Sequence, residues 1–486
     1  MPGIRGRQRI SPPFSSDLGG ILRVEATRLN ATMVRSEITI PTEVLSDIFH
    51  LLCDAPIALH DLKNDSHFHE FPWAVGQVSR RWRGAFLYDT RLWTSFALEP
   101  GTFSADYFVE MNRRVTIYLE RSGQQPLTID VAMPCSSPKT FPKTIWEMLL
   151  SCLKRWKKAD LILVYGGALD QLLRCKEYMS SLESLTMCIP DLRAVENYNI
   201  FQVAPHLTEL GLAHPGYTSK WQFPWAQLTK LNLEVFCEEF NDHYSNNLWG
   251  VLFQLKNIEE LHIIATFGGA RAPSPLPVVC LPCLQLLEIS LVFAVIFSWF
   301  TAPLLEHLHI HGCADLAYDH DDQPYERELT SLIQRSSCHI RRLVLENCGT
   351  KEMRTMMKAL AGVEELSITH YPGPPIIIQD ITGLDNCIYL PKLQVLEVTE
   401  SFRMKNTLVA VSLLENAVTV FSRLFEVRGK ELSMASHDIV PLEKFVLRLT
   451  LRGECPDNVL EMMHGWPSFA QVYINGFVLK RLTRSL

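Results

Sequence analysis

The stretch Leu305-Glu-His-Leu308-His-Ile310-His-Gly-Cys313 has apolar residues at its first, fourth and sixth positions and a cysteine at its ninth. The stretch Ile340-Arg-Arg-Leu343-Val-Leu345-Glu-Asn-Cys348 repeats this pattern further along the chain. Side chains alternate between the two faces of a strand, so the fourth and sixth positions are expected to be buried together. The two stretches predict a repeated unit of a short strand and a return segment, with the cysteine as a buried turn residue.

Other stretches keep the three apolar positions without a cysteine at the ninth. They are Leu182/Leu185/Met187, Leu207/Leu210/Leu212, Leu228/Leu231/Leu233, Ile258/Leu261/Ile263, Leu284/Leu287/Ile289, Val363/Leu366/Ile368 and Leu393/Leu396/Val398, with weaker copies at Leu442/Phe445/Leu447 and Phe469/Val472/Ile474. Copies between Leu182 and Leu393 begin 21 to 35 residues apart, which brackets the leucine-rich-repeat period of about 20–29. Such units bury their apolar sides only by stacking. The pattern therefore predicts an α/β fold, an irregular leucine-rich-repeat solenoid over residues 99–486 with a C-terminal cap.

Residues 37–98 have helical periodicity, and residues 1–36 read as a flexible tail whose pattern allows a short helix over Ile21–Val34. Pro41 suits a first helical position, because its missing N–H would lack a partner there. One apolar stripe contains Val44, Leu45, Ile48, Phe49 and Leu52. A second helix is expected from Trp73 to Leu87, carrying Val75, Val78, Trp82 and Phe86. A helical segment of this length can form only a marginal core. A partner is therefore expected to cover part of the apolar stripe.

Two motifs in this segment resemble an F-box. Ile40-Pro41-Thr-Glu43-Val-Leu45-Ser-Asp-Ile48-Phe49-His-Leu-Leu52 resembles its first half, and Val78-Ser-Arg80-Arg81-Trp82-Arg83 with Leu92-Trp93 resembles its second half. Their order is similar to that of the fungal F-box-like family, as is Tyr118-Leu-Glu-Arg-Ser-Gly123-Gln-Gln-Pro-Leu127 before the repeats. The insert Ala55–Phe71 between the halves is longer than the compact motif uses. The resemblance implies a small three-helix F-box followed by the solenoid.

The resemblance also implies a function, that of a non-catalytic substrate-recognition subunit of an SCF ubiquitin ligase. The F-box would bind a Skp-family adaptor and through it a cullin, and the repeats would bind an unknown target protein. The implied residues of the F-box core and adaptor-facing surface are Pro41, Val44, Leu45, Ile48, Phe49, Val78, Trp82, Leu92 and Trp93. Two alternatives stay open: a ligase-independent repeat scaffold capped by the helical segment, and an enzyme without a recognisable motif. No phosphate-binding glycine loop, nucleophile elbow or zinc-protease helix occurs, so neither catalysis nor a cofactor is expected.

The concave face of the solenoid is the expected target-binding surface. The candidate residues are Glu209, Glu260, Glu288, His307, His309, His311, Arg342 and Glu365. The same face also carries three further acids, Glu234, Glu346 and Glu397, and one further base, Lys230. This face is therefore acidic on balance. A basic target would be favoured by charge complementarity, although acidic residues also simply solvate a surface.

Three groups of residues contain side chains that can bind metals. We nevertheless expect no metal site at any of them. His307, His309 and His311 alternate on one strand, but a strand rise places alternate residues roughly 7 Å apart, too far to share an ion easily. Cys280-Leu-Pro-Cys283 lacks a second pair at zinc spacing. The loop histidines His60, His67 and His69 fit a solvated loop.

The composition limits the remaining functions. The 486 residues carry a net charge of −7, which argues against a dedicated nucleic-acid binder and favours an exposed helix face for Arg80-Arg81-Trp82-Arg83. The thirteen cysteines are scattered, unlike a secreted disulfide framework. The uncharged stretch Ile289–Leu305 falls short of the roughly 20 residues of a membrane span. A cytoplasmic or nuclear protein that contacts neither nucleic acid nor membrane is expected.

Overall fold

The computed structural model describes residues 40–52, 56–59, 75–98, 105–133, 143–163, 166–175, 179–188, 201–213, 222–235, 242–265, 277–312, 325–370, 390–401, 418–419, 421–422, 424–425, 440–450, 466–468, 470–474 and 477–478. The predicted tail with its Ile21–Val34 helix, the loop histidines and Cys313 lie outside these residues. The chain divides into two compact units. The first contains Met1–Asp54 and Lys63–Leu92, and the second contains Ala55–Leu62 and Trp93–Leu486.

The first unit is helical in its described part. Its helices are α2 (Thr42–Leu52), α3 (Val75–Val78) and α4 (Arg80–Tyr88), and the short 3-10 helix η2 (Thr90–Trp93) follows. Both α2 and α3 pack against α4. The sequence predicted one helix from Trp73 to Leu87, but Ser79 interrupts it. Ser79 has an extended backbone (φ −158°) and its hydroxyl accepts a hydrogen bond from the Trp82 N–H, so it caps the start of α4.

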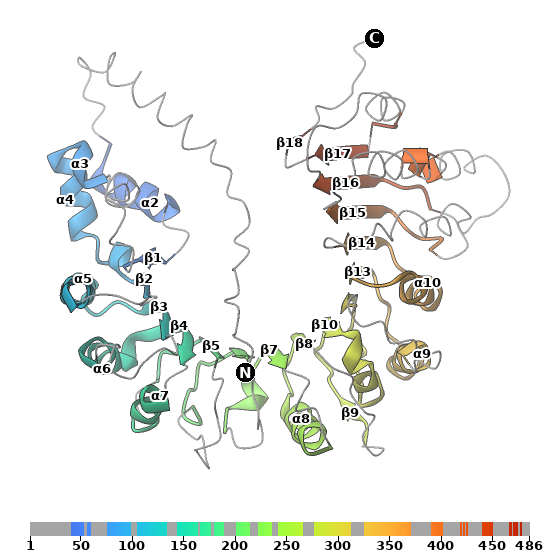
Figure 1. Cartoon of the computed structure of the whole chain (residues 1–486), viewed down its shortest axis with the longest axis horizontal. Helices are drawn as coiled ribbons and strands as arrows, with labels where there is room; N and C mark the ends of the chain where they lie inside the picture. The colour runs from blue at the N-terminus through green and yellow to red at the C-terminus, as the bar shows by residue number, and fades with distance from the viewer. Residues whose placement is uncertain are drawn as a thin grey trace, which may run out of the picture. The chain divides into compact units, whose positions relative to one another are not determined.

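The second unit contains one long sheet whose strands follow one another in chain order (Figure 1). The strands are β1 (Ile57–Ala58), β2 (Ser95–Leu98), β3 (Leu127–Met133), β4 (Trp156–Leu163), β5 (Ser184–Cys188), β6 (Glu209–Ala213), β7 (Lys230–Val235), β8 (Glu260–Ala265), β10 (Leu286–Ser290), β12 (His307–His311), β13 (Arg342–Glu346), β14 (Glu365–His370), β15 (Val395–Ser401), β16 (Lys444–Thr450), β17 (Ala470–Ile474) and β18 (Phe477–Val478). Within the described residues, 15 strands pair in parallel, and only β18 is antiparallel to its neighbour. A separate parallel pair joins β9 (Val279–Cys280) to β11 (Phe300–Thr301).

The register of the sheet follows the repeat pattern. From β5 to β16, the middle apolar residues of successive copies are direct partners across the sheet, and they are Leu185, Leu210, Leu231, Leu261, Leu287, Leu308, Leu343, Leu366, Leu396 and Phe445. In the last copy Val472 is instead the partner of Leu447. All of them are buried. The two weaker copies therefore extend the same sheet, the second of them two residues out of register. A long parallel sheet of sequential strands, built from an α/β repeat, is consistent with a leucine-rich-repeat-like solenoid.

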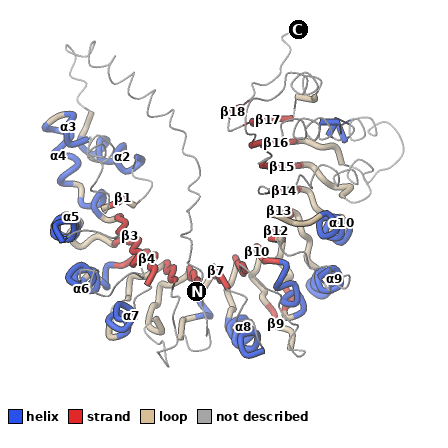
Figure 2. The backbone as a smooth tube through the Cα atoms, viewed as in Figure 1, coloured by secondary structure: helices blue, strands red, loops and turns tan. Residues whose placement is uncertain are grey.

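The return segments contain helices that lie on one side of this sheet (Figure 2). They are α5 (Ala105–Arg121), α6 (Lys143–Ser151), α7 (Gly166–Leu173), α8 (Asp242–Gln254), α9 (Tyr325–Ser336) and α10 (Thr350–Ala359), with 3-10 helices η3 (Leu153–Arg155), η5 (Trp225–Gln227) and η7 (Leu291–Ser298). The middle apolar residues are buried on the side of the sheet that carries the helices, whereas most of their strand neighbours are more exposed; Gly211 and Val446 are the exceptions. We call the opposite side of the sheet the open face.

The uncharged stretch Ile289–Leu305 begins in the last two residues of β10 and continues into a return segment. It runs through η7 and β11, and Phe293, Phe297 and Phe300 are fully buried there. The apolar character of the stretch is thus explained by packing under the sheet. Among the residues that the structure describes, no helix is long and apolar enough to cross a membrane.

Candidate functional sites

The helical unit has a small aromatic core. Leu45 and Phe49 of α2 are buried against α4. The Phe49 ring lies 5.4 Å from the Trp82 ring and 6.5 Å from the Phe86 ring, measured between centroids. Trp82 itself is half-buried. These contacts fix α2 to α4 and explain one half of the apolar stripe that the sequence shows on α2.

The other half of that stripe is exposed. Val44, Ile48, Leu51 and Leu52 recur at i, i+4, i+7 and i+8 on α2, so they lie along one side of the helix. Two further apolar side chains of the unit are exposed, Val78 at the end of α3 and Tyr88 at the end of α4. Single exposed apolar residues are ordinary on a protein surface, and the helical unit carries several of them.

The nine residues that the resemblance implied thus divide into two groups. Pro41, Val44, Ile48 and Val78 are exposed, and Trp82 is half-buried. Leu45, Phe49, Leu92 and Trp93 are buried. Trp93 belongs to the second unit, where its ring contacts Tyr118 at 4.8 Å and the Arg121 guanidinium lies 4.3 Å from its centroid. The sequence did not single out the exposed Leu51 and Tyr88.

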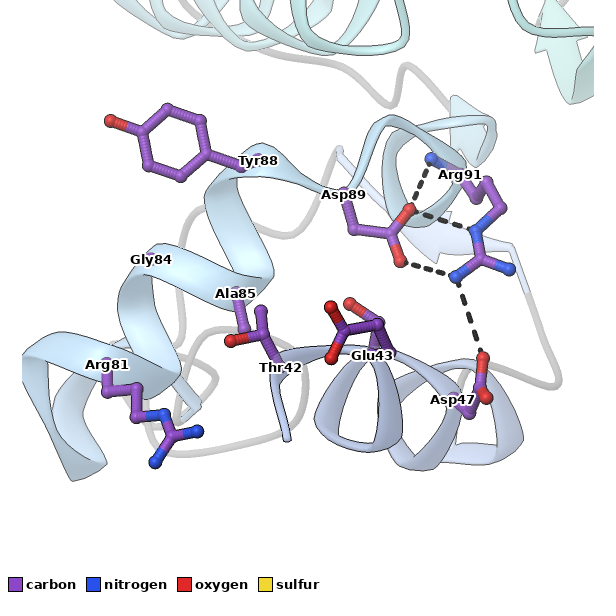
Figure 3. Close-up of a pocket in the computed structure, with 10 residues that line it drawn as sticks. Thr42, Glu43, Asp47, Arg81, Gly84, Ala85, Tyr88, Asp89 and Arg91 are labelled. Atoms are coloured by element: carbon purple, nitrogen blue, oxygen red, sulfur yellow. Dashed lines mark hydrogen bonds and ion pairs between the residues drawn. The ribbon is translucent and has the colours of Figure 1, made fainter. Parts of the chain in front are cut away.

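An open pocket of about 510 Å³ lies between α2 and α4 (Figure 3). Charged groups line one end of it: Arg91 donates to Asp89 at 2.9 Å, and its Nη2 lies 3.6 Å from Asp47. Burial alone would raise the pKa of Asp89, but hydrogen bonds from Arg91 and Ser46 bring it below its ordinary value. Tyr88 points away from these groups. A partner in this pocket would therefore meet the paired charges of Arg91 and Asp89.

The open face presents the side chains that alternate with the buried repeat residues. All eight residues that the sequence proposed for target binding are half-buried or exposed: Glu209, Glu260, Glu288, His307, His309, His311, Arg342 and Glu365. Several of the acids on this face have basic neighbours. Lys230 lies 2.5 Å from Glu260, and Lys444 lies 3.0 Å from Glu397. This face is therefore less acidic in effect than the count of carboxylates indicates.

Histidines and carboxylates converge at one place on this face. Glu288 lies between His262 and His309 on three adjacent strands, because these residues are direct partners in the register. Its Oε1 lies 2.5 Å from His311 Nε2 and 3.3 Å from His309 Nδ1. Its Oε2 forms a short contact with His262 Nδ1. We call His262, Glu288, His309, His311 and Glu346 the histidine–glutamate cluster.

Glu346 closes the far side of this cluster. Its Oε1 lies 3.3 Å from His309 Nε2 and its Oε2 lies 3.2 Å from His311 Nδ1. The two carboxylates therefore hold the two histidine rings from opposite sides. The ring centroids of His309 and His311 are 4.3 Å apart.

The pKa values in the cluster reflect these contacts. Burial would raise the pKa of Glu288, but hydrogen bonds from His262 and His311 and the nearby charges of His309 and His311 bring it well below its usual range. Hydrogen bonds from His309 and His311 lower the pKa of Glu346 to about 2. Burial opposes protonation of His311, yet the two carboxylates raise its pKa to about 9.

The geometric argument against convergence of these histidines was wrong. It considered the rise along one strand and left out the freedom of two long side chains to lean together, which brings the rings of His309 and His311 into contact. His262 was missed altogether. The repeat pattern itself held the signal, since His262, Glu288 and His309 all stand between the second and third apolar positions of their copies.

The cysteines of the described segments form no disulfide with one another. Cys348 is buried, as the repeat pattern predicted, and its thiol lies 3.7 Å from the Ile310 carbonyl oxygen. Cys280 is exposed and Cys283 is half-buried. Burial raises the pKa of the Cys175 and Cys338 thiols, which makes them poor nucleophiles at neutral pH.

No known protein-family model matches this chain, and no curated protein matches its sequence. The strand order and the parallel pairing alone define the class of this chain. It is an α/β repeat protein with a long parallel sheet and a small helical unit.

Proposed function

We propose that this chain is a non-catalytic substrate-recognition subunit of an SCF ubiquitin ligase. The helical unit binds a Skp-family adaptor, which links it to a cullin, and the open face of the repeat sheet binds the protein to be ubiquitinated. The observation that carries the proposal is the exposed apolar surface of the helical unit, which coincides with the two motifs that resemble an F-box.

The contacts of this surface support a docking role. Leu45 and Phe49 anchor α2 to α4 from inside, so the exposed Val44, Ile48 and Leu51 project from a supported helix. Apolar side chains presented on a pre-ordered helix lose little conformational entropy on binding. We assign adaptor contact to Pro41, Val44, Ile48, Val78 and Trp82, to which Leu51, Leu52 and Tyr88 are now added. Leu45, Phe49, Leu92 and Trp93 have structural roles.

The open face supports the second half of the proposal. Repeat proteins of this kind present extended faces to protein partners. Side chains such as His307 and Arg342 are partners across adjacent strands and reach outward from the sheet. The pairing of Glu260 with Lys230 lowers the expected preference for a strongly basic target. The target is thus a protein recognised by mixed polar contacts.

The test is binding of the full-length chain to an immobilised recombinant Skp-family adaptor. Val78→Glu places a charge on the proposed surface, where the side chain is 60% exposed. Val203→Glu is the matched control, since Val203 is 64% exposed but lies in the repeat unit. We expect Val78→Glu to weaken adaptor binding by about 10-fold or more, as central interface residues do, and Val203→Glu to leave it unchanged.

The outcomes separate the alternatives. Binding that is lost with Val78→Glu and kept with Val203→Glu supports the adaptor role, provided that circular dichroism of the two variants matches the wild type. Absence of adaptor binding by the wild-type chain would leave a ligase-independent repeat scaffold, with the helical unit as a cap. Equal weakening by both variants would place the adaptor contact elsewhere.

A further inference from the structure

The histidine–glutamate cluster is the one place on the described part of the open face where three metal-ligating side chains come within reach of a single ion. Ligand atoms of Glu288, His309 and His311 all lie within 4.8 Å of one another. They come from two adjacent strands, β10 and β12, whose register is fixed by the buried leucines on the other side of the sheet. The arrangement is therefore a property of the fold and does not depend on a loop.

We propose that Glu288, His309 and His311 bind one divalent transition-metal ion of the zinc class, with Glu346 and His262 as positioning residues. Zinc bound by imidazole and carboxylate has bond lengths of about 2.0–2.2 Å, which places neighbouring donor atoms of a tetrahedron roughly 3.3 Å apart. The distance from His309 Nδ1 to Glu288 Oε1 is 3.3 Å. His311 Nε2 lies closer to the same oxygen, at 2.5 Å, and moves outward by a small side-chain rotation to admit the ion.

Glu346 supplies the support that metal-bound histidines need. If His309 binds the ion through Nδ1 and His311 through Nε2, their remaining nitrogens carry protons. Those nitrogens are the atoms nearest to the Glu346 carboxylate, at 3.3 Å and 3.2 Å. A carboxylate in this place fixes both tautomers and makes both rings better ligands. One residue from β13 thus orients both histidines of β12.

His262 supports the third ligand in the same way. Its Nδ1 contacts Glu288 Oε2, which leaves Oε1 directed toward His309 and His311. Its Nε2 lies 3.5 Å from Glu260 Oε2, so both ring nitrogens of His262 face carboxylates.

The donor set selects the class of ion. Two imidazoles and one carboxylate suit zinc and its neighbours among the first-row metals, whereas calcium and magnesium prefer oxygen ligands alone. Three protein ligands leave a fourth coordination position of a tetrahedral ion open. That position faces away from the helices, because all three side chains project from the open face. A water molecule fills it in the absence of another ligand.

The experiment is titration of the untagged, full-length chain with ZnCl₂ by isothermal titration calorimetry, after removal of metal with a chelator. Co²⁺ is the spectroscopic probe, because its visible absorption reports tetrahedral coordination. We expect one ion to bind per chain in the wild type, and His311→Gln and His309→Gln to abolish the binding. Glu346→Gln is expected to weaken the affinity by about 10- to 100-fold, as supporting residues of metal sites do.

His307→Gln is the matched control, since it removes a histidine from the same face of the same strand without touching the cluster. A chain with His60→Gln, His67→Gln and His69→Gln tests for binding by the loop histidines. Both control chains are expected to bind Zn²⁺ like the wild type. The proposal is overturned if the wild type does not bind Zn²⁺, or if His309→Gln and His311→Gln both bind it unchanged. If His311→Gln fails to fold, the affinity of Glu346→Gln and the Co²⁺ spectrum of the wild type test the proposal instead. Unchanged affinity together with a Co²⁺ spectrum that shows no tetrahedral coordination would overturn it.

Discussion

Replacing Gly312 by alanine tests the close approach of two strand ends beside the histidine–glutamate cluster. Gly312 follows β12, and its N–H donates to the Glu346 carbonyl oxygen at 2.7 Å. A Cβ at this position would lie 2.5 Å from Cys348 Cα and 2.7 Å from the Asn347 carbonyl carbon, with the Asn347 carbonyl oxygen nearer still. Ordinary carbon contacts begin near about 3.5 Å. The clash is between backbone atoms, so no side-chain rotation relieves it.

The expected cost follows from these contacts. Inserting a methyl group into a closely packed place costs about 1–3 kcal/mol. Loss of the hydrogen bond from Gly312 to Glu346 adds about 0.5–1.5 kcal/mol. We therefore expect Gly312→Ala to lower the free energy of unfolding by roughly 2–4 kcal/mol. Because the displaced strand end carries His311 and its neighbour carries Glu346, the affinity for Zn²⁺ is expected to fall as well.

The assay is urea unfolding followed by circular dichroism, with Gly250→Ala as the matched control. Gly250 lies inside helix α8, and a Cβ there meets no atom within 4 Å. Alanine in a helix interior is more stable than glycine by about 0.5–1 kcal/mol. The two substitutions should therefore shift the unfolding midpoint in opposite directions. A Gly312→Ala chain within about 0.5 kcal/mol of the wild type would refute the close-packing argument.

Three further predictions concern other parts of the chain. Phe49→Ala should cost about 3–5 kcal/mol, because a fully buried ring is removed, whereas the exposed Ile48→Ala should change the stability little; limited proteolysis of the helical unit measures the difference. Hydrogen bonds from Arg113 lower the pKa of Glu110 to about 2, so this pair stabilises the fold at neutral pH and the contribution is lost as the pH falls from about 4.5 to about 2. Arg113→Gln should lower the stability at pH 7 by less than about 1 kcal/mol, since the pair is partly exposed. The unfolding curves of the two chains should therefore differ slightly at pH 7 and converge at pH 2. Cys280 should react with a thiol reagent much faster than Cys348 in the folded chain, since the former is exposed and the latter buried, and peptide mapping would contradict this if both are labelled together.

Most of the strand register could be predicted from the sequence, because it follows from the repeat pattern; the exception is β17, where Val472 pairs with Leu447 and not with Phe445. Aligning the middle leucines of the copies places Leu287 beside Leu308 and Leu308 beside Leu343, which are the observed pairs. The first strands could not be found in this way. β1 has two residues and β2 has four, too few to show the three apolar positions, so these strands depend on pairing with β3 and its neighbours.

The candidate sites were predictable to different degrees. The apolar stripe of α2 was visible, but its division into buried Phe49 and exposed Ile48 depends on where α4 packs, which periodicity alone does not give. The histidine–glutamate cluster depends on how side chains lean from the sheet. Spacing along β12 gives only the distance between backbone positions, whereas Glu346 and Glu288 draw the rings of His309 and His311 together by charge and hydrogen bonding.

The two outermost strands of the described sheet have a consequence for solubility. β1 and β18 each contain two residues, and β18 runs antiparallel to β17. A sheet edge exposes unpaired N–H and C=O groups that can pair with other molecules. Very short edge strands expose few such groups. A cut between β12 and β13 would turn two five-residue inner strands into open edges. Fragments divided there are expected to associate edge to edge, in a concentration-dependent way that the intact chain avoids.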